Sequence, residues 1–159
     1  MNAERPLVSL AAEGPAAPPP LALALDHAGA SVGDLDRAIA FYTEVFGFVV
    51  DETFAIPGTA VRGAVLVNAG GARVELFHRE GSAASPPGHP IDSTLRQGWF
   101  QLAFRVPDVD SAFDRVVAAG ATAVKPPFRA PDGRCRVAFV GDPDGNLIEL
   151  IQREAPGAP

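Results

Sequence analysis

The sequence contains one cysteine, Cys135, among its 159 residues. A single cysteine cannot form an intrachain disulfide, and by itself it cannot anchor a zinc site built from thiolates. No apolar run approaches the roughly 18 residues that a membrane span requires. Basic residues are few and scattered, since 13 Lys and Arg against 19 Asp and Glu give a net charge of −6. Nucleic acids and anionic membranes are therefore not expected partners.

The N-terminus lacks a basic segment followed by an apolar stretch, which a secretory signal would need. Residues 1–22 instead form an arm rich in proline and alanine without hydrophobic periodicity. We expect a cytoplasmic protein with one compact domain over residues 23–152 and a short tail at 153–159. With 47% hydrophobic residues the chain can bury a substantial core.

The sequence repeats itself at an offset of 74 residues. This shift places His27 on Gln101 and Glu75 on Glu149. It also aligns six pairs of identical residues: Val32 with Val106, Asp34 with Asp108, Asp36 with Asp110, Ala38 with Ala112, Gly71 with Gly145 and Leu76 with Leu150. A duplicated unit folds as two similar modules. We expect module one at 23–80, a linking loop at 81–97 and module two at 98–152.

Hydrophobic periodicity predicts the same order of elements in both modules. Asp34 and Asp108 are suitable N-caps for helices that end at Gly47 and Gly120. The fold class is α+β, with two pseudo-symmetric βαβββ modules whose helices cover the outer sheet faces. The predicted strands are Leu23–Val32, Phe48–Ile56, Val61–Asn68, Arg73–Arg79, Trp99–Val106, Ala121–Val124, Arg134–Val140 and Asn146–Gln152.

The repeat brings four polar side chains into equivalent positions. Alternation along the strands places His27, Glu75, Gln101 and Glu149 opposite the apolar face that packs on the helices. If the modules pair about a pseudo-twofold axis, the four side chains meet. Two carboxylates, an imidazole and an amide oxygen form a mixed N/O ligand set for a divalent cation. Nickel, cobalt, zinc, manganese, magnesium and iron all suit this set. The alternative is that each is an ordinary strand residue.

Other polar and aromatic residues are weaker candidates. Trp99 and Phe77 are expected to line the cavity, and Arg73 and Arg105 to meet an anionic part of a small-molecule substrate. His78 points away from Glu75 by alternation and is not expected to be a ligand.

Two segments resemble a known superfamily. Residues 25–27 with 32–48, and the ending at 141–151 (Gly-Asp-Pro-Asp-Gly-Asn-Leu-Ile-Glu-Leu-Ile), resemble the opening and closing motifs of the vicinal oxygen chelate superfamily. The superfamily includes glyoxalase I, extradiol dioxygenases and bleomycin-binding proteins. The resemblance implies a glyoxalase-like fold whose sheets curl around a central cavity, often within a homodimer. It also implies that His27, Glu75, Gln101 and Glu149 are the metal ligands.

The resemblance implies a metal-dependent lyase or isomerase that transfers a proton next to a metal-bound oxygen of a small substrate. Glu149 and Glu75 are then the catalytic candidates, with Glu149 favoured as the base and Glu75 as the anchor. A metal-free protein that binds a small molecule such as an antibiotic is the principal alternative. An Fe(II) oxygenase fits the ligand set less well. The substrate, and whether the site forms within one chain or between two, remain open at this stage.

Overall fold

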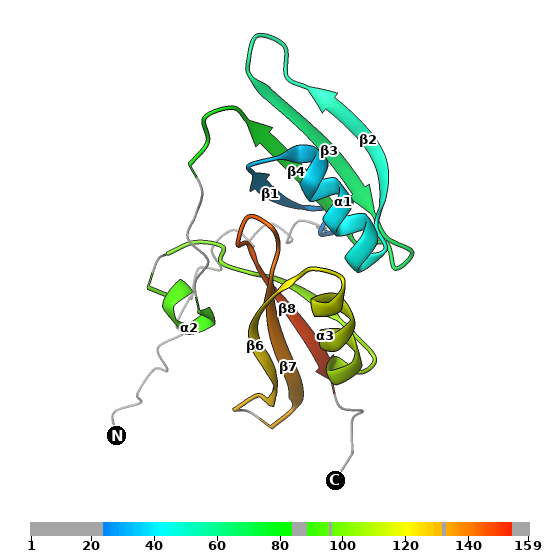
Figure 1. Cartoon of the computed structure of the whole chain (residues 1–159), viewed down its shortest axis with the longest axis vertical. Coiled ribbons are helices and arrows are strands. Elements are labelled where there is room, and N and C mark those ends of the chain that lie inside the picture. Colours follow the sequence, from blue (N-terminus) through cyan, green and yellow to red (C-terminus); the bar gives the residue numbers. More distant parts are fainter. Residues whose placement is uncertain (1–23, 84–88, 96, 132, 154–159) are drawn as a thin grey trace, which may run out of the picture.

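The computed structural model describes residues 24–83, 89–95, 97–131 and 133–153, so the predicted arm at 1–22 lies outside the described residues. Two four-stranded sheets, each with one long helix, make up this part of the chain (Figure 1). The predicted α+β class with two βαβββ units is confirmed. The two sheets do not close into a barrel. None of the described helices is long and apolar enough to span a membrane.

The first unit contains a sheet of strand order β1-β4-β3-β2, in which β1 runs parallel to β4 and the other pairs are antiparallel. Its elements are β1 (Ala28–Val32), α1 (Leu35–Phe46), β2 (Val49–Ala55), β3 (Val61–Val67) and β4 (Arg73–Arg79). The second unit repeats this topology as β5-β8-β7-β6. Its elements are β5 (Leu102–Arg105), α3 (Val109–Ala118), β6 (Thr122–Arg129), β7 (Cys135–Gly141) and β8 (Leu147–Arg153).

Both long helices begin at the predicted caps. The Asp34 carboxylate accepts a hydrogen bond from the Arg37 backbone N–H, and the Asp108 carboxylate accepts one from that of Ser111. These bonds satisfy N–H groups that have no partner inside the helix. Helix α1 ends at Gly47, whose φ of 69° lies in the left-handed region that glycine adopts without strain.

Several predicted boundaries were wrong. Strands β1 and β5 are edge strands that begin only at Ala28 and Leu102, so each pairs only along part of the predicted length. Strand β6 continues to Arg129, because an edge strand tolerates its two prolines and the register irregularities beside them. The predicted linking loop contains a short helix, α2 (Pro90–Ser93), which hydrophobic periodicity does not reveal in four residues.

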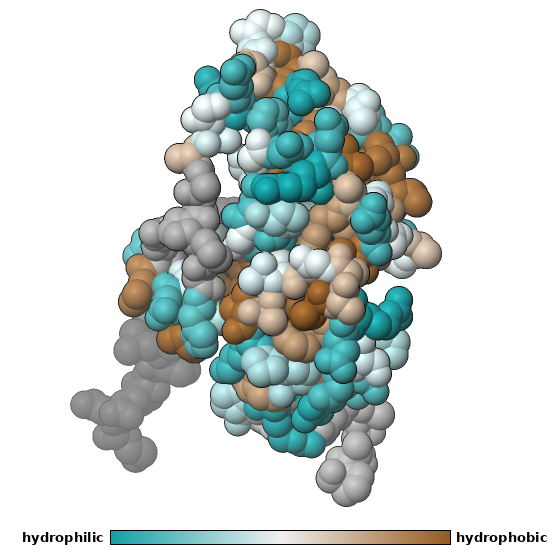
Figure 2. All heavy atoms as spheres, in the orientation of Figure 1, coloured by the Kyte–Doolittle hydropathy of each residue, from teal (hydrophilic) through white to brown (hydrophobic). Residues whose placement is uncertain are grey.

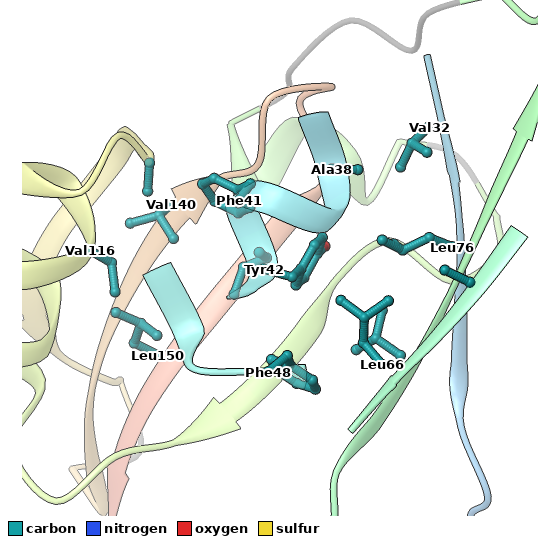
Figure 3. Close-up of a cluster of buried hydrophobic side chains, with 14 of the residues drawn as sticks. Val32, Ala38, Phe41, Tyr42, Phe48, Leu66, Leu76, Val116, Val140 and Leu150 are labelled. Atoms are coloured by element: carbon teal, nitrogen blue, oxygen red, sulfur yellow. The ribbon is translucent and has the colours of Figure 1, made fainter. Parts of the chain in front are cut away.

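One apolar core joins the two units on the helix side of the sheets. It combines residues of both units, and Figure 3 labels Val32, Ala38, Phe41, Tyr42, Phe48, Leu66, Leu76, Val116, Val140 and Leu150. Helices α1 and α3 contact each other (Figure 1). The Phe104 ring of β5 lies 5.4 Å from that of Phe46 and 5.7 Å from that of Phe48, measured between centroids. The core therefore leaves the opposite, inner sheet faces available for other contacts.

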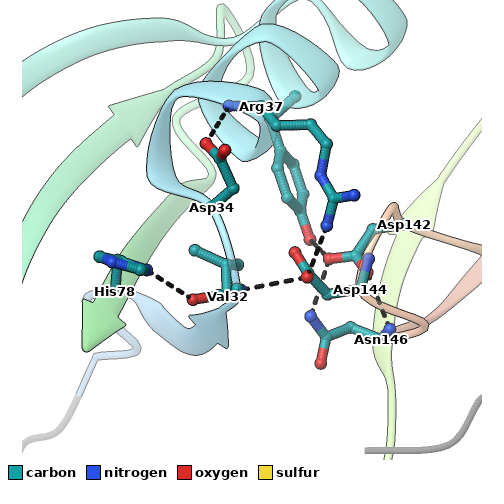
Figure 4. Close-up of polar contacts among 9 residues, drawn as sticks. Val32, Asp34, Arg37, His78, Asp142, Asp144 and Asn146 are labelled. Atoms are coloured by element: carbon teal, nitrogen blue, oxygen red, sulfur yellow. Dashed lines mark hydrogen bonds and ion pairs between the residues drawn. The ribbon is translucent and has the colours of Figure 1, made fainter. Parts of the chain in front are cut away.

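A buried carboxylate adds a polar connection between the units. Asp142 is 2% exposed, and its carboxylate accepts hydrogen bonds from the Tyr42 hydroxyl at 3.2 Å and from the backbone N–H groups of Asp144 and Asn146 (Figure 4). Next to it, the Asp144 carboxylate accepts hydrogen bonds from the Gly33 backbone N–H at 3.0 Å and from the Arg37 side chain at 2.8 Å. The 142–146 turn of the second unit is thereby fastened to the first.

We predict that Asp142→Ala lowers the free energy of unfolding by about 2–4 kcal/mol, because it leaves a buried hydroxyl and two backbone N–H groups without their acceptor. Asp110→Ala is the control, since Asp110 forms an ion pair with Arg136 at the surface and should cost no more than about 1 kcal/mol. Urea denaturation measures both values. Equal losses in the two variants would contradict the role assigned to Asp142.

Candidate metal centre

The first pair of predicted ligands lies on the inner face of the first sheet. His27 immediately precedes β1, and Glu75 belongs to β4. Gly29 lies opposite Glu75 in the parallel register, so His27, two residues earlier, faces the same side. The His27 Nε2 and Glu75 Oε2 atoms are 3.0 Å apart. The carboxylate is largely covered, with 19% of the side chain exposed, while His27 is 41% exposed.

The second pair occupies the equivalent place in the second unit. Gln101 immediately precedes β5, and Ala103 lies opposite Glu149 of β8. The Gln101 side-chain amide donates a hydrogen bond to Glu149 Oε2 at 2.5 Å. Each unit therefore presents one carboxylate beside one nitrogen-bearing side chain. On the edge strand, the residue opposite the glutamate is small: Gly29 opposite Glu75 and Ala103 opposite Glu149.

The donor atoms have a spacing that suits a divalent ion. Two cis ligands about 2.1 Å from an octahedral ion lie about 3 Å from each other. The His27–Glu75 separation matches this value. In the second pair the amide could turn its oxygen toward an ion, because the oxygen and nitrogen of the group are interchangeable by rotation. Imidazole, amide oxygen and two carboxylates are also chemically suitable ligands.

The structure brings the four predicted ligands together as two pairs and not as one cluster. Within the described residues, no three His, Cys, Asp or Glu side chains lie close enough together to hold a metal ion. Glu149 therefore does not join His27 and Glu75 in a single chain. We call the two pairs half-sites: His27–Glu75 is the first half-site, and Gln101–Glu149 is the second.

The two half-sites differ electrostatically. Glu149 lies opposite Phe139 in the sheet register and between Leu147 and Ile151 on the inner face, which carries a second apolar cluster. Burial raises the pKa of the Glu149 carboxyl above its usual range, and the hydrogen bond from Gln101 partly opposes this shift. A carboxylate in such a place is a stronger proton acceptor than one in water.

The first half-site is more polar. Asp26 Oδ1 lies 2.8 Å from His27 Nδ1, and this hydrogen bond, together with the negative charge of Glu75, raises the pKa of the imidazole above its usual range. Arg73 lies two residues from Glu75 on the same face and forms an ion pair with Asp51 at 2.8 Å. Asp51 lies at a β-bulge of β2, where the register with β3 shifts between Val50 and Glu52. Its carboxylate contacts Arg73.

The residues predicted to bind substrate have different surroundings. Phe77 shares the inner face with Glu75 and packs edge-on against Phe54, with ring centroids 5.5 Å apart. Trp99 is fully exposed. Arg105 is also exposed and has no hydrogen bond or ion pair with any described residue. The prediction that His78 faces away from Glu75 is confirmed, because its ring contacts the Val32 carbonyl at 3.3 Å (Figure 4).

A groove of about 1030 Å³ runs between the N-terminal ends of β1 and β5. His27 and Gln101 line it, but neither glutamate does. Its walls include apolar residues that the sequence did not single out, namely Leu25, Leu95 and Phe100. Apolar side chains also lie over α2 at the surface (Figure 2), where Ile91 is 66% exposed. Leu25 and Phe100 fall in segments that were predicted as strands but precede β1 and β5 in the structure. Ile91 and Leu95 fall in the predicted linking loop, where an isolated apolar residue carries no periodic signal.

Comparison with known proteins gives matches over most of the chain. A family model described as "Glyoxalase/Bleomycin resistance protein/Dioxygenase superfamily" matches residues 24–150. A probable lactoylglutathione lyase of Vibrio cholerae is 32% identical over 131 residues, which cover 80% of this chain and 89% of the relative. A lactoylglutathione lyase of Arabidopsis thaliana is 35% identical over 130 residues, which cover 80% of this chain and 43% of the relative.

Solved structures have the same fold. Glyoxalase I from Zea mays is similar at a TM-score of 0.66 and 30% identity, over 82% of this chain and 44% of that one. The chain thus spans less than half the length of the maize and Arabidopsis proteins. A glyoxylase/bleomycin resistance protein/dioxygenase domain from Frankia sp. EAN1pec has a TM-score of 0.69 at 23% identity, covering 86% of this chain and 95% of that one, which supports the fold alone.

We predict that Gln101→Leu raises the pKa of Glu149 further in metal-free protein. The leucine keeps most of the bulk that buries the carboxyl but removes the hydrogen bond that lowers its pKa. Gln97→Leu, at an exposed position of the groove, is the control and should leave the Glu149 pKa unchanged. NMR titration of the Glu149 carboxyl carbon gives both values, and an unchanged or lower pKa in Gln101→Leu would contradict the hydrogen bond.

Proposed function

The chain belongs to the glyoxalase/bleomycin resistance protein/dioxygenase superfamily, and from this premise we propose that it is a metal-dependent lyase or isomerase of the glyoxalase I type. The observation that carries the proposal is the pair of half-sites, each with a carboxylate beside a second ligand residue: His27 Nε2 lies 3.0 Å from Glu75 Oε2, and the Gln101 amide is hydrogen-bonded to Glu149. Several relatives bear the name lactoylglutathione lyase, which supports a reaction that interconverts a thioester of a small hydroxy acid and the adduct of a thiol with a 2-oxoaldehyde.

We infer that one complete site combines the first half-site of one chain with the second half-site of another. Each half-site offers two protein ligands, and the described part of one chain does not bring the two glutamates to a common ion. In a twofold-symmetric homodimer the same contact occurs twice, so two chains would form two identical four-ligand sites. Exposed apolar side chains beside the groove, including Leu25, Leu95 and Trp99, are available for burial against a second copy.

In the proposed site His27, Glu75, Gln101 and Glu149 hold a divalent cation, which when bound supplies Lewis-acid polarisation of a substrate oxygen. The adduct of a thiol with a 2-oxoaldehyde becomes a lactoyl thioester when two protons change place. One moves from the carbon that bears sulfur to the adjacent carbon, and the hydroxyl proton moves from the oxygen of the first carbon to the oxygen of the second. In the proposal the Glu149 carboxylate removes the C–H proton from the first carbon and returns it to the second. The apolar surroundings of the partly buried Glu149 raise the pKa of its carboxyl and so favour proton uptake. Glu75, beside His27, acts as the anchor.

We predict different outcomes for the two glutamates. Glu149→Gln should lower kcat by about 10²–10⁴-fold with little change in KM, since proton transfer is lost while the pocket stays. Glu75→Gln should chiefly lower metal content, because it removes a charged ligand. Elemental analysis and single-turnover rates on metal-saturated protein, with lactoylglutathione formation as the assay, measure both effects.

Glu44→Gln, on the exposed surface of α1, is the matched control and should change neither quantity. An active, metal-saturated Glu149→Gln beside an inactive Glu75→Gln would reverse the two assignments. A wild-type protein that binds a small ligand but neither retains a divalent ion nor turns over would instead identify a metal-free binding protein.

Mixing the Glu75→Gln and Glu149→Gln variants tests whether the sites form between chains, in assays without added metal, where the first lacks its ion and the second lacks its base. A heterodimer of Glu75→Gln and Glu149→Gln combines both substitutions in one site and leaves the other site wild type. We expect about a quarter of wild-type activity to return after the variants are mixed, unfolded and refolded together, because half of the dimers are mixed and each has one intact site. Each variant refolded alone is the control. No recovery in the mixture would show that the sites do not form between chains.

A further inference from the structure

The His27 ring has a carboxylate at each of its two nitrogen atoms. Asp26 Oδ1 lies 2.8 Å from Nδ1, and Glu75 Oε2 lies 3.0 Å from Nε2. Both carboxylates could attract the single proton of a neutral ring, but only the contact with Asp26 is a hydrogen bond, whereas Glu75 acts on the ring through its charge. Glu75 is largely covered, whereas Asp26 is 80% exposed and approaches the ring from the solvent side.

We propose that Asp26 is a positioning residue that fixes the orientation and tautomer of His27, so that Nε2 is the nitrogen offered to a metal ion beside Glu75. A neutral imidazole carries one N–H, and a carboxylate hydrogen-bonded to Nδ1 keeps the proton there. The lone pair of Nε2 is then free to act as a ligand. Carboxylates in this outer position commonly increase the metal affinity of a histidine. The metal-binding part of this inference rests on the proposed function.

The duplication within the chain provides an internal comparison. The offset of 74 residues that places His27 on Gln101 places Asp26 on Phe100. Asp26 therefore directly precedes His27, a ligand whose tautomer can be fixed. Phe100 directly precedes Gln101, whose amide has no tautomers to select. Phe100 instead lines the groove between β1 and β5.

The remaining charges near the ring do not replace Asp26. Apart from Asp26, the charged groups that act on the imidazole are Glu75, at the other nitrogen, and Arg73. The Arg73 guanidinium forms an ion pair with Asp51 and cannot accept a hydrogen bond. No other side chain among the described residues forms a hydrogen bond with Nδ1.

Asp26→Ala, Asp26→Glu and the charge-matched control Asp114→Ala, at an exposed position of α3, test the inference. The first measurement is the His27 tautomer in metal-free protein, from ¹⁵N chemical shifts of the ring, at a pH above the midpoint that a titration of the same ring gives for each variant. We expect the Nδ1–H form in wild type and Asp114→Ala. The Nε2–H form should gain population in Asp26→Ala, and Asp26→Glu should restore the wild-type state at least in part.

The second measurement is the affinity for Zn²⁺ by titration against a competing chelator. We expect Asp26→Ala to bind Zn²⁺ about 10–100-fold more weakly than wild type, with Asp114→Ala unchanged. Wild-type ring shifts in Asp26→Ala would overturn the positioning role whatever the affinity, and a changed tautomer with unchanged Zn²⁺ affinity would overturn the link between this role and metal binding. If wild-type protein binds no Zn²⁺, the proposed metal function fails, while the tautomer measurement still decides whether Asp26 positions His27.

Discussion

The burial of Asp142 fixes the relationship between the two units of the chain. A carboxylate that is 2% exposed is stable only when its oxygens are hydrogen-bonded, and these partners come from α1 of the first unit and from the turn before β8 of the second. The apolar core next to it has no directional preference of its own. The hydrogen bonds of Asp142 orient the second unit relative to the first. They thereby help to position β8, the strand that carries Glu149.

This arrangement explains why the ligands occur as pairs. Both helices pack on the same shared core, so the outer faces of both sheets are used for folding. The inner faces are left with side chains that contribute little to that core, and each holds a glutamate next to the end of an edge strand. The four ligand residues are thus not part of the core that folds one chain. Substitutions at these positions can therefore be accepted without loss of the fold.

Features decided by local chemistry were predictable from the sequence. The helix α1 was expected between Asp34 and Gly47 because an N-cap carboxylate and a left-handed glycine act within one turn, and the structure has both. The repeat and strand alternation predicted that His27, Glu75, Gln101 and Glu149 face the same side and meet, whereas within one chain the structure brings them together only as two pairs. The strand ends at Ala28 and Leu102 did not, because they depend on how far a partner strand extends.

Features that depend on long-range packing could not be read in advance. Asp26 and His27 are neighbours in the sequence, yet the sequence alone does not show that the carboxylate is hydrogen-bonded to the ring. The groove between β1 and β5 arises from the angle between the two units, which the hydrogen bonds of Asp142 and Asp144 help to set. The raised pKa of the Glu149 carboxyl likewise comes from burial, which exists only after folding.

The separation of the half-sites has a consequence for the thermodynamics of assembly. If a complete site requires two chains, an ion that binds it binds only the associated state, and by mass action it stabilises that state over free chains. Metal occupancy then depends on protein concentration, and dilution favours loss of the ion together with loss of the partner. A protein built this way links its activity to its own abundance without any separate regulatory element.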